Sequence, residues 1–426
     1  MSQVIEAQDD TTPSPVDAEL SRANFRYLVL DIAWFGLAMP ATARFLSVYA
    51  IRLDASPALL GWLAALPALI ALVTSSWAAW WRGRHTTMTQ SMWWPGLFFR
   101  LMFLLPAFTP LFPAHMQPWW LVVAVALPAV ANGISSVLFL VLMRQAVVPS
   151  QLTLLFSRRS LVFNVTVGVG TLAFGLWLEL MPFPGNYQVM FVAAFALSVG
   201  SFICVQRLRP LAPADIPPAD RVPVRPWQSP IFRRTAFVAV LVHVAFFSIL
   251  PIIPLRLVDE LGADEGFMSV FAVVELATAA LIAAVTYRIV RRIGALTAVA
   301  IGMIVSAVAA AILVVASSLP VTLVGAALSG AAWTVVAISL FGYFSENAPA
   351  ESLTRFMTVF NQVVLLAIFI GPLLGSQLAS ASLSLTTVLA LGAGLRLLAG
   401  GLIALDCTGC LARVRRWSRL SSAADG

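Results

Sequence analysis

The sequence contains no lysine, since all 26 basic residues among its 426 are arginine. Charged residues make up only 11% of the chain, against about a quarter in an average soluble protein. In contrast, 60% of the residues are hydrophobic, and the mean hydropathy is +0.92. This composition excludes a soluble globular protein, because so much apolar surface could not be hidden from water. Most of the chain must therefore face lipid.

Cysteine and recognisable catalytic motifs are also scarce. Cys204 lies in an apolar segment, and Cys407 and Cys410 form a single C-x-x-C near the end of the chain. One such pair without a nearby histidine is weak evidence for a metal site, so we interpret these residues as unpaired thiols. We find no phosphate-binding loop and no polar segment large enough to bind and hydrolyse ATP. We therefore expect no enzyme activity, no metal and no cofactor, and energy that comes from a gradient.

Residues 207–234 are rich in proline and arginine and separate two sets of six long apolar segments. A helix needs about 20 apolar residues to cross a bilayer. The first set comprises residues 27–50, 58–80, 91–111, 119–143, 160–181 and 187–205. The second comprises residues 235–257, 266–287, 294–316, 321–343, 356–378 and 383–405. The segments are too long for barrel strands. We predict an all-α membrane protein with twelve transmembrane helices in two bundles, 27–206 and 235–405, flanked by tails 1–26 and 406–426.

Arginine is distributed unevenly between the two sides of the predicted membrane. Twelve spans divide the polar segments into two alternating sets, of which one holds 21 arginines and the other only Arg52 and Arg256. Short cytoplasmic loops carry the excess of basic residues in membrane proteins. We expect both termini and the linker 207–234 to face the cytoplasm. The acidic start of the chain, with Glu6, Asp9 and Asp10, does not resemble a signal peptide.

The two halves repeat each other. The tripeptide Val162-Phe163-Asn164 recurs as Val359-Phe360-Asn361, 197 positions later, and Gly133 and Gly330 share that offset. Arg52 and Arg256 both precede a short loop and an apolar segment that ends in a basic turn. Each half has an even number of spans, so the repeats are parallel and related by an axis along the membrane normal.

Two six-helix halves, a basic linker and a basic turn after the second helix of each half resemble the major facilitator superfamily over residues 27–405. The first turn matches the family's loop motif at Arg82, Gly83 and Arg84 but lacks its aspartate, and the second keeps Arg288, Arg291, Arg292 and Gly294. The proline of the helix-five signature of drug antiporters is absent. The resemblance implies alternating access, with two bundles that rock about a central cavity, and a gating or interbundle role for the basic turns.

Two acidic residues at membrane depth are candidates for proton coupling. A charge at the bilayer centre costs about 2.5–3.5 kcal/mol on insertion scales, so each one needs a reason. Glu275 lies in the middle of the eighth span, where burial disfavours the charged form of a carboxylate and favours uptake of a proton. The alternative is a structural glutamate paired with a buried arginine. Asp31 lies about one turn into the first helix, and Trp34, a candidate substrate contact, falls on the same helix face.

Three arginines also fall inside spans. Arg44 is a candidate for binding an anionic group of the substrate, since a guanidinium forms bidentate bonds to a carboxylate or phosphate. Snorkelling, or pairing within its own bundle, is the alternative. Arg44 and Asp31 point in different directions on an ideal helix, unless Pro40 distorts it, so we do not predict that they pair. Arg100 and Arg396 lie in helices that the family places away from the cavity, and we interpret both as structural.

The remaining polar candidates are single side chains in the spans. His243 could relay protons or contact substrate, although a lone histidine in an apolar stretch is more often a satisfied core residue. Family analogy puts three further residues on cavity-side helices, where they are plausible substrate contacts: Asn132, Trp333 and Gln362. Asn164 and Asn361 are candidates for a gate, or for hydrogen bonds between helices that only hold the fold together.

These observations favour a secondary active transporter that moves a small organic solute by alternating access. We predict coupling to protons, a slight preference for efflux, a location in the bacterial cytoplasmic membrane, and a monomer without nucleic-acid partners. One alternative is an importer or uniporter of a sugar or organic anion. Another is a receptor or assembly factor that has the transporter fold but no longer transports. Retention of Glu275 and Arg44 argues against that second alternative, because such groups are costly in a membrane.

Overall fold

The structure is a computed structural model that describes residues 15–148, 151–211, 225–347, 353–381 and 383–422. These residues contain helices and turns and no β-strand. Twelve helical segments in the described part of the chain are long and apolar enough to cross a membrane, so the predicted all-α fold with twelve spans is confirmed. The predicted tail 1–26 and linker 207–234 lie partly outside the described residues, as do the side chains of Cys407 and Cys410.

The first six spans are built from eleven helical elements. They are α1 (Pro15–Ala38), α2 (Pro40–Ala43), α3 (Phe45–Arg52), α4 (Pro57–Ser75), α5 (Ala78–Arg82), α6 (Met88–Leu104), the 3-10 helices η1 (Leu105–Leu111) and η2 (Ala114–Met116), α7 (Gln117–Ala146), α8 (Leu152–Leu180) and α9 (Gly185–Gln206). A short 3-10 helix, η4 (Pro226–Gln228), precedes the second six spans. The seventh span comprises α10 (Pro230–Phe247), α11 (Ile252–Leu255) and the π-helix η5 (Arg256–Glu260). The remaining five spans are α12 (Glu265–Ile293), α13 (Ala295–Val315), α14 (Leu319–Asn347), α15 (Leu353–Ser380) and α16 (Leu385–Ser422).

Capping residues fix where several spans begin. The side chains of Ser56, Ser229 and Asp264 accept hydrogen bonds from the backbone N–H groups three residues later, at the starts of α4, α10 and α12. Proline follows two of these caps, as Pro57 and Pro230, where its missing N–H has no cost. Local sequence thus sets the ends of these spans before any tertiary contact forms.

The first and seventh spans are both interrupted. The first breaks at Met39, before Pro40, and again at Arg44, whose backbone has φ −122° and ψ −53°. The seventh breaks after Phe247, near Pro251, and continues through α11 into the π-helix η5. Proline lacks the N–H that would continue the hydrogen-bond ladder, and this explains a break at the corresponding place in each half. At Arg44 the break redirects the side chain relative to a straight helix.

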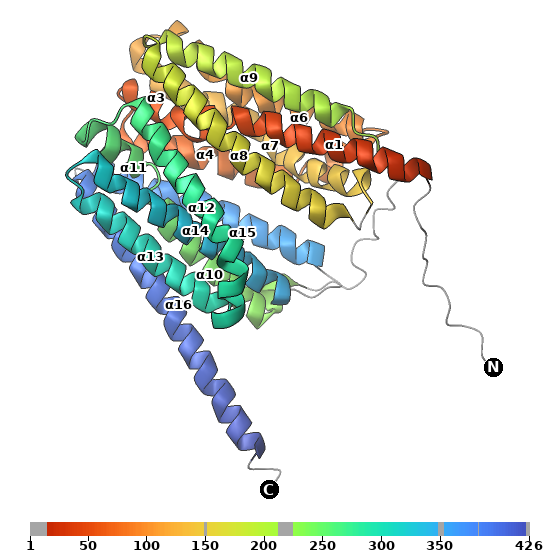
Figure 1. Ribbon diagram of the computed structural model, residues 1–426, viewed down its shortest axis with the longest axis vertical. Helices are drawn as coiled ribbons and strands as arrows, with labels where there is room; N and C mark the ends of the chain where they lie inside the picture. The colour runs from red at the N-terminus through yellow and green to blue at the C-terminus, as the bar shows by residue number, and fades with distance from the viewer. Residues whose placement is uncertain (1–14, 149–150, 212–224, 348–352, 382, 423–426) are drawn as a thin grey trace.

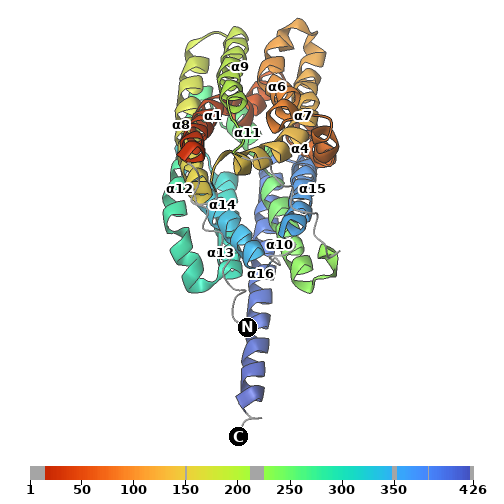
Figure 2. The ribbon, with the colours of Figure 1, turned by 90° about the vertical axis from the view of Figure 1, so that its right-hand side faces the viewer.

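The spans form two bundles, which Figures 1 and 2 show as a red-to-yellow group and a green-to-blue group. Within the first bundle α7 packs on α4 and α6, and α1 packs on α8 and α9. Within the second α13 packs on α14 and α16, α12 on α14, and α10 on α15. We call the end of each bundle that carries Gln206 and Pro230 the linker end, and the opposite end, which carries Arg52 and Glu265, the far end.

Two seams join the bundles, one between α4 and α15 and the other between α8 and α12. A glycine faces a serine in each. A Cβ added at Gly61 would lie 1.8 Å from Ser376 Oγ, and a Cβ added at Gly175 would lie 1.6 Å from Ser269 Oγ. Only glycine leaves room for such close approach, so each seam requires glycine at this position. These glycines lie towards the far end of their helices.

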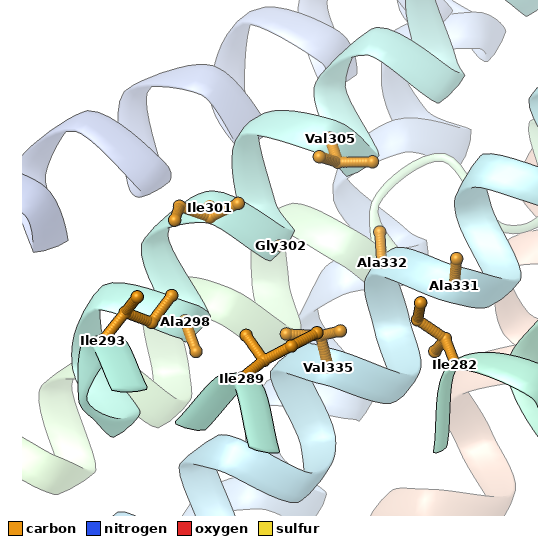
Figure 3. Close-up of a pocket in the computed structure, with 10 residues that line it drawn as sticks. All are labelled: Ile282, Ile289, Ile293, Ala298, Ile301, Gly302, Val305, Ala331, Ala332 and Val335. Carbon is orange, nitrogen blue, oxygen red and sulfur yellow. The ribbon is translucent and has the colours of Figure 1, made fainter. Parts of the chain in front are cut away.

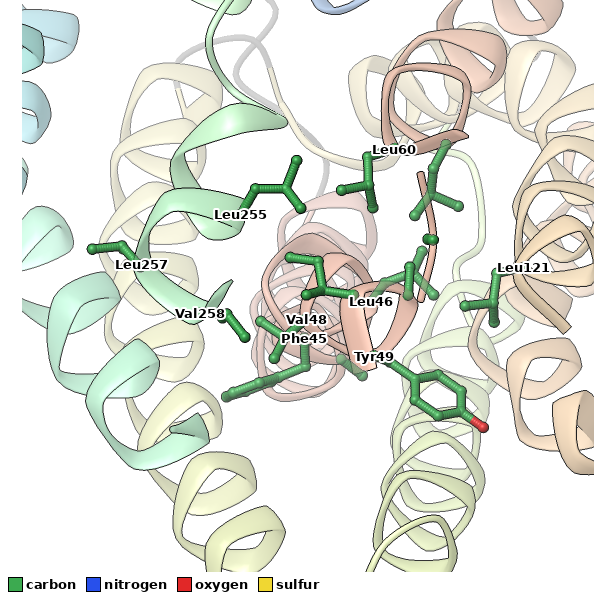
Figure 4. Packing of buried hydrophobic residues seen from close by; sticks show 14 of the residues in the cluster. Phe45, Leu46, Val48, Tyr49, Leu60, Leu121, Leu255, Leu257 and Val258 are labelled. Atoms are coloured by element: carbon green, nitrogen blue, oxygen red, sulfur yellow. The ribbon is translucent and has the colours of Figure 1, made fainter. Parts of the chain in front are cut away.

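The apolar cores follow the same division. One cluster draws on both bundles at the far end, where Phe45, Tyr49 and Leu60 of the first pack near Leu255 and Val258 of the second (Figure 4). A second cluster belongs to the second bundle alone, and a third belongs to the first bundle alone, both towards the linker end. The bundles therefore share a core at the far end and have separate cores at the linker end.

Three span boundaries differ from the sequence-based expectation. The first helix, α1, begins at Pro15 and not near residue 27, so part of the predicted tail is helical and Asp31 lies more than one turn into the helix. The fifth helix, α8, begins at Leu152 and not near residue 160, so Arg159 lies inside a helix and not in a loop. The twelfth helix, α16, continues to Ser422, well beyond the apolar run, and projects from the second bundle in Figures 1 and 2. The stretch beyond residue 405 contains no proline and only one glycine before Ser422, so little in its sequence would stop the helix.

Candidate functional site

An ion pair between the two bundles is the centre of the candidate site. Arg44, at the second break of the first span, places Nη1 2.7 Å from Glu275 Oε2 on α12. Among the described residues Glu275 Oε2 has no hydrogen-bond partner of good geometry, so the contact is an ionic attraction without a directed hydrogen bond. The side chains are 31% and 20% exposed, respectively. The pair is thus mostly enclosed, with Glu275 Oε2 itself buried, so exchange with a proton or a solute requires the contact to open.

The backbone of Glu275 is held firmly on its other side. A Cβ added at Gly330 of α14 would lie 2.1 Å from the carbonyl oxygen of Glu275, so α14 and α12 are in close contact there. Arg396 on α16 is near enough to Glu275 to interact electrostatically. Its guanidinium is fully engaged, because it donates to the carbonyl oxygens of Ala245, Phe246 and Ser306. A rigid scaffold thus carries a glutamate whose side chain is free to change partners.

Asp31, the other predicted coupling residue, lies in a closed network within the first bundle. Arg159 Nη1 is 2.9 Å from Asp31 Oδ2, and Ser201 Oγ donates to Asp31 Oδ1 at 2.7 Å. Arg100 donates to the same Ser201 hydroxyl at 2.7 Å and to the carbonyl oxygen of Ser198 at 2.6 Å. Asp31, Arg100 and Arg159 are all buried. The network ties together α1, α6, α8 and α9, an arrangement that supports a structural role.

Sequence reasoning missed Arg159, because it was assigned to the basic loop before the fifth span. Its guanidinium also donates to the carbonyl oxygen of Leu28 on α1. A buried aspartate such as Asp31 needs a partner, and this requirement was the only signal that could have drawn attention to an arginine at the edge of another span.

A second interbundle ion pair lies at the far end. Arg52 Nε is 3.0 Å from Glu265 Oε1, and Arg52 Nη2 is 3.1 Å from Oε2, so the pair is bidentate. Tyr187 Oη also donates to Glu265 Oε1, at 3.0 Å. Tyr187 stacks on Tyr49 with ring centroids 4.4 Å apart. Sequence analysis noted Arg52 as one of only two arginines on its side, but that rarity did not reveal its partner.

An aromatic group in the second bundle brings two predicted substrate contacts together. The rings of His243 and Trp333 are 5.4 Å apart and nearly perpendicular, and Trp333 stacks on Phe246 at 4.2 Å. His243 is buried, and its Nδ1 lies 2.8 Å from the carbonyl oxygen of Ala239. This position fits the expectation of a satisfied core histidine better than that of an exposed relay.

The other predicted substrate contacts lie apart from this group. Trp34 is 41% exposed on α1 and packs against Gly200 of α9, within the first bundle. Asn132 on α7 and Gln362 on α15 are both half-buried. The structure does not join these three side chains to the Arg44–Glu275 pair through any hydrogen bond between described residues. Their roles stay predictions.

The predicted gating residues lie towards the linker end. Asn164 is exposed, and in the described part of the chain its Nδ2 donates within its own helix, to the carbonyl oxygen of Ser160 at 2.9 Å. Asn361 is also exposed.

The basic turns also lie towards the linker end. In the first half Arg82 donates to the carbonyl oxygen of His85, and Arg84 lies over the ring of Trp80. In the second half Arg288, Arg291 and Arg292 are exposed on the last turns of α12. Gly83 follows α5 in an ordinary helical conformation.

Among the described residues no group of three or more histidine, cysteine, aspartate and glutamate side chains could hold a metal ion. The site provides ionic contacts. Glu275 and Glu265 bridge the bundles, because each faces an arginine of the other bundle. Such contacts can form and break as the bundles move.

Solved structures with the same fold are transporters. A mutant of the nucleoside transporter NupG matches with a TM-score of 0.69 and 10% identity, over 90% of this chain and 99% of that chain. A D-xylose-proton symporter matches with a TM-score of 0.70 and 11% identity, over 90% and 97%. A bacterial homologue of the iron transporter ferroportin, in an inward-facing state, matches with a TM-score of 0.66 and 13% identity, over 89% and 98%. At such identity these likenesses show the fold alone.

No curated protein matches the chain in sequence. A family model, described as Major Facilitator Superfamily, matches residues 27–372. That range covers most of the chain and includes both members of each interbundle ion pair. The sequence match agrees with the twelve spans, the two bundles and the transporter structures of the same fold. The protein belongs to the Major Facilitator Superfamily.

Proposed function

We propose that the protein is a secondary active transporter that moves a small organic solute by alternating access, with Glu275 as the proton-carrying group. The observation that carries the proposal is the Arg44–Glu275 ion pair, because it joins the two bundles at membrane depth. A protonated Glu275 is neutral and loses its attraction to Arg44. Uptake of a proton would therefore weaken one contact between the bundles and release the guanidinium for a solute.

The seams support the same mechanism. Both glycine–serine contacts and both interbundle ion pairs lie between the middle of the spans and the far end, whereas each bundle has its own core at the linker end. A transporter that is closed at the far end and open at the linker end has this distribution of contacts. With the linker in the cytoplasm, as the arginine asymmetry favours, this distribution of contacts supports an inward-facing state.

We propose the bacterial cytoplasmic membrane as the location and export as the direction. Arg44 makes a solute with an anionic group the first class to test, and the aromatic group around Trp333 could contact an apolar part of it.

Proton movement in proteoliposomes tests the proposal. A pH dye is trapped inside, and pools of sugars, organic acids, amphiphilic drugs and peptides are offered outside to the wild type and to Glu275→Gln. We expect a solute-triggered pH change that the variant loses while it still inserts and folds. Alkalinisation of the lumen as solute enters indicates exchange for protons, as in an exporter, whereas acidification indicates symport.

Two results would contradict the proposal. Labelled solute that crosses without any proton movement would identify a uniporter. Unchanged coupling in Glu275→Gln would remove the assigned role of Glu275, even if transport itself were established. Arg44→Gln serves as the partner variant, since it should impair solute binding and still allow Glu275 to take up a proton.

A further inference from the structure

The second bundle contains an apolar cavity that the transport mechanism does not use. It has a volume of about 160 Å³ and lies among α12, α13 and α14 (Figure 3). Ile282, Ile289 and Ile293 of α12 line one side, and Ile301 and Val305 of α13 line another. All of its lining residues are apolar. Such a cavity offers no partner for water, so at membrane depth a hydrocarbon chain is the natural occupant.

Helix geometry explains why the cavity exists. α12 and α13 are joined by a single-residue turn at Gly294, whose φ of +84° suits glycine. Both helices nevertheless pack on α14, and α13 also packs on α16, while the two contact each other little. A Cβ added at Gly302 would lie 2.6 Å from Val336 Cγ2, so α13 approaches α14 closely at that point. Small residues such as Gly302 and Ala332 thus form the floor, and the longer isoleucines form the walls.

An arginine cluster lies on the same turns of α12 as the cavity wall. The cluster consists of Arg288, Arg291 and Arg292, and all three arginines are exposed. Two of the cavity-lining isoleucines, Ile289 and Ile293, lie in the same stretch of sequence. At about 100° per residue, Arg292 lies roughly 80° and Arg288 roughly 120° from the mean direction of the three isoleucines, on the same side, whereas Arg291 lies opposite. The ring of Tyr287 lies under the guanidinium of Arg291. None of the three arginines forms an ion pair with a described residue.

We propose that the cavity and its flanking arginines form a binding site for an anionic glycerophospholipid. One acyl chain occupies the groove between α12 and α13, and the phosphate lies at Arg288 and Arg292. Charge complementarity at the end of an apolar groove favours this occupant, since arginines beside a membrane-spanning helix attract acidic headgroups, by roughly fivefold in affinity for each residue. The site is independent of the Arg44–Glu275 pair and of the proposed transport function.

Native mass spectrometry of the purified full-length protein tests the site. The protein is equilibrated with equal amounts of phosphatidylglycerol and phosphatidylcholine that have the same acyl chains, and retained lipid is counted. We expect wild type to retain phosphatidylglycerol preferentially and R288Q/R292Q to lower that preference on the order of tenfold or more. The matched control, R82Q/R84Q, removes two arginines from the equivalent turn of the first half, where Arg82 donates to the carbonyl oxygen of His85 and Arg84 lies over the ring of Trp80, and should lower the preference much less.

A second pair of variants tests the groove. Ile301 lines the cavity and is 47% exposed, so Ile301→Trp should fill part of the groove and lower retention of both lipids severalfold. Leu398→Trp changes an exposed leucine on α16 outside the cavity and should have no effect. Monodisperse elution and an unchanged Tm confirm that each variant is folded. Equal retention of the two lipids by wild type, or full retention by folded R288Q/R292Q or Ile301→Trp, would overturn the proposal.

Discussion

In the first bundle Asp31 is held on both carboxylate oxygens, by Arg159 and by Ser201 of the same bundle. In the second bundle Glu275 has its ion-pair partner, Arg44, in the other bundle. Both are acidic residues at membrane depth, and both looked like coupling candidates in the sequence. Their partners separate them, because a contact within one bundle survives a rocking motion, whereas a contact between bundles does not.

The comparison extends to the scaffold around each position. In the first bundle Gly133 of α7 packs against Ala71 and Thr74 of α4. In the second bundle Gly330 of α14 packs against Glu275 and Thr278 of α12. The same glycine-mediated contact thus occurs in both halves. The position that Ala71 occupies in the first half is occupied by Glu275 in the second. Duplication has kept the helix packing, and a single carboxylate makes the two halves chemically different.

The largest expected effect is on the stability of the protein, and it distinguishes Asp31 from Glu275. Asp31→Asn leaves the buried guanidinium of Arg159 without a counter-charge, which costs about 3–5 kcal/mol. We expect a large fall in Tm and in the yield of monodisperse protein. Glu275→Gln leaves a partly exposed Arg44, so it should cost less than Asp31→Asn and lower Tm less.

A double variant sharpens this test. Asp31→Asn/Arg159→Met removes both charges and should recover much of the lost Tm, since an apolar pair often replaces a buried ion pair well. Equal Tm shifts for Asp31→Asn and Glu275→Gln would show that the contrast between the bundles does not hold.

The next effect concerns the seam between α8 and α12. Gly175→Ala places a methyl group where Ser269 Oγ now lies, and overpacking of this kind costs about 1–3 kcal/mol. The variant should disfavour the closed far end and shift the conformational equilibrium by roughly fivefold to 150-fold. Gly168→Ala in the same helix is the control, because no atom lies within 4 Å of its added Cβ.

Distances between spin labels report that shift. Cysteines introduced at Met116 and Ser318 would label far-end segments of opposite bundles, in a background without Cys204, Cys407 and Cys410. We expect longer distances to gain population in Gly175→Ala and not in Gly168→Ala. An unchanged distribution in both variants would mean that the seam does not control closure.

A smaller effect is expected at the far-end ion pair. Arg52 is 39% exposed, so Arg52→Gln should remove about 1 kcal/mol or less from the closed state. The same label pair should show a shift of no more than about fivefold, smaller than that of Gly175→Ala. Raising the salt concentration should mimic the substitution in wild type and have less effect in the variant. A larger shift than that of Gly175→Ala would reverse the ranking of steric and ionic contacts.

The smallest effect concerns the repeated asparagines. Asn164 is exposed and bonds only within α8, so Asn164→Ala should change Tm by an amount equivalent to less than about 0.5 kcal/mol. Asn361→Ala is the matched change in the second half. If both variants lose transport while they stay folded, the asparagines act as a gate in another state of the cycle. Unchanged transport would mean that the repetition of the asparagines reflects only the common ancestry of the two halves.

The spans were predictable because hydrophobic length and arginine asymmetry are local properties of the sequence. The identities of the ion-pair partners were not, although pairing with a buried arginine was the alternative given for Glu275. Glu275 was identified as costly, but its pairing with Arg44 depends on the helix break at Pro40 and on contact between bundles, neither of which follows from spacing. Arg159 was placed in a loop because the apolar run begins after it. Pairing is a tertiary property, and helix boundaries near charged residues depend on it.

The extension of α16 to Ser422 has a mechanical consequence. At 1.5 Å per residue, its 38 residues make a rod about 57 Å long, roughly twice the thickness of the bilayer's hydrocarbon core. The rod belongs to the second bundle, so it acts as a lever: a rotation of that bundle by about 10° would move the tip by up to about 10 Å. A fluorophore attached near Ser422 would magnify the rocking motion and report each turnover from outside the membrane.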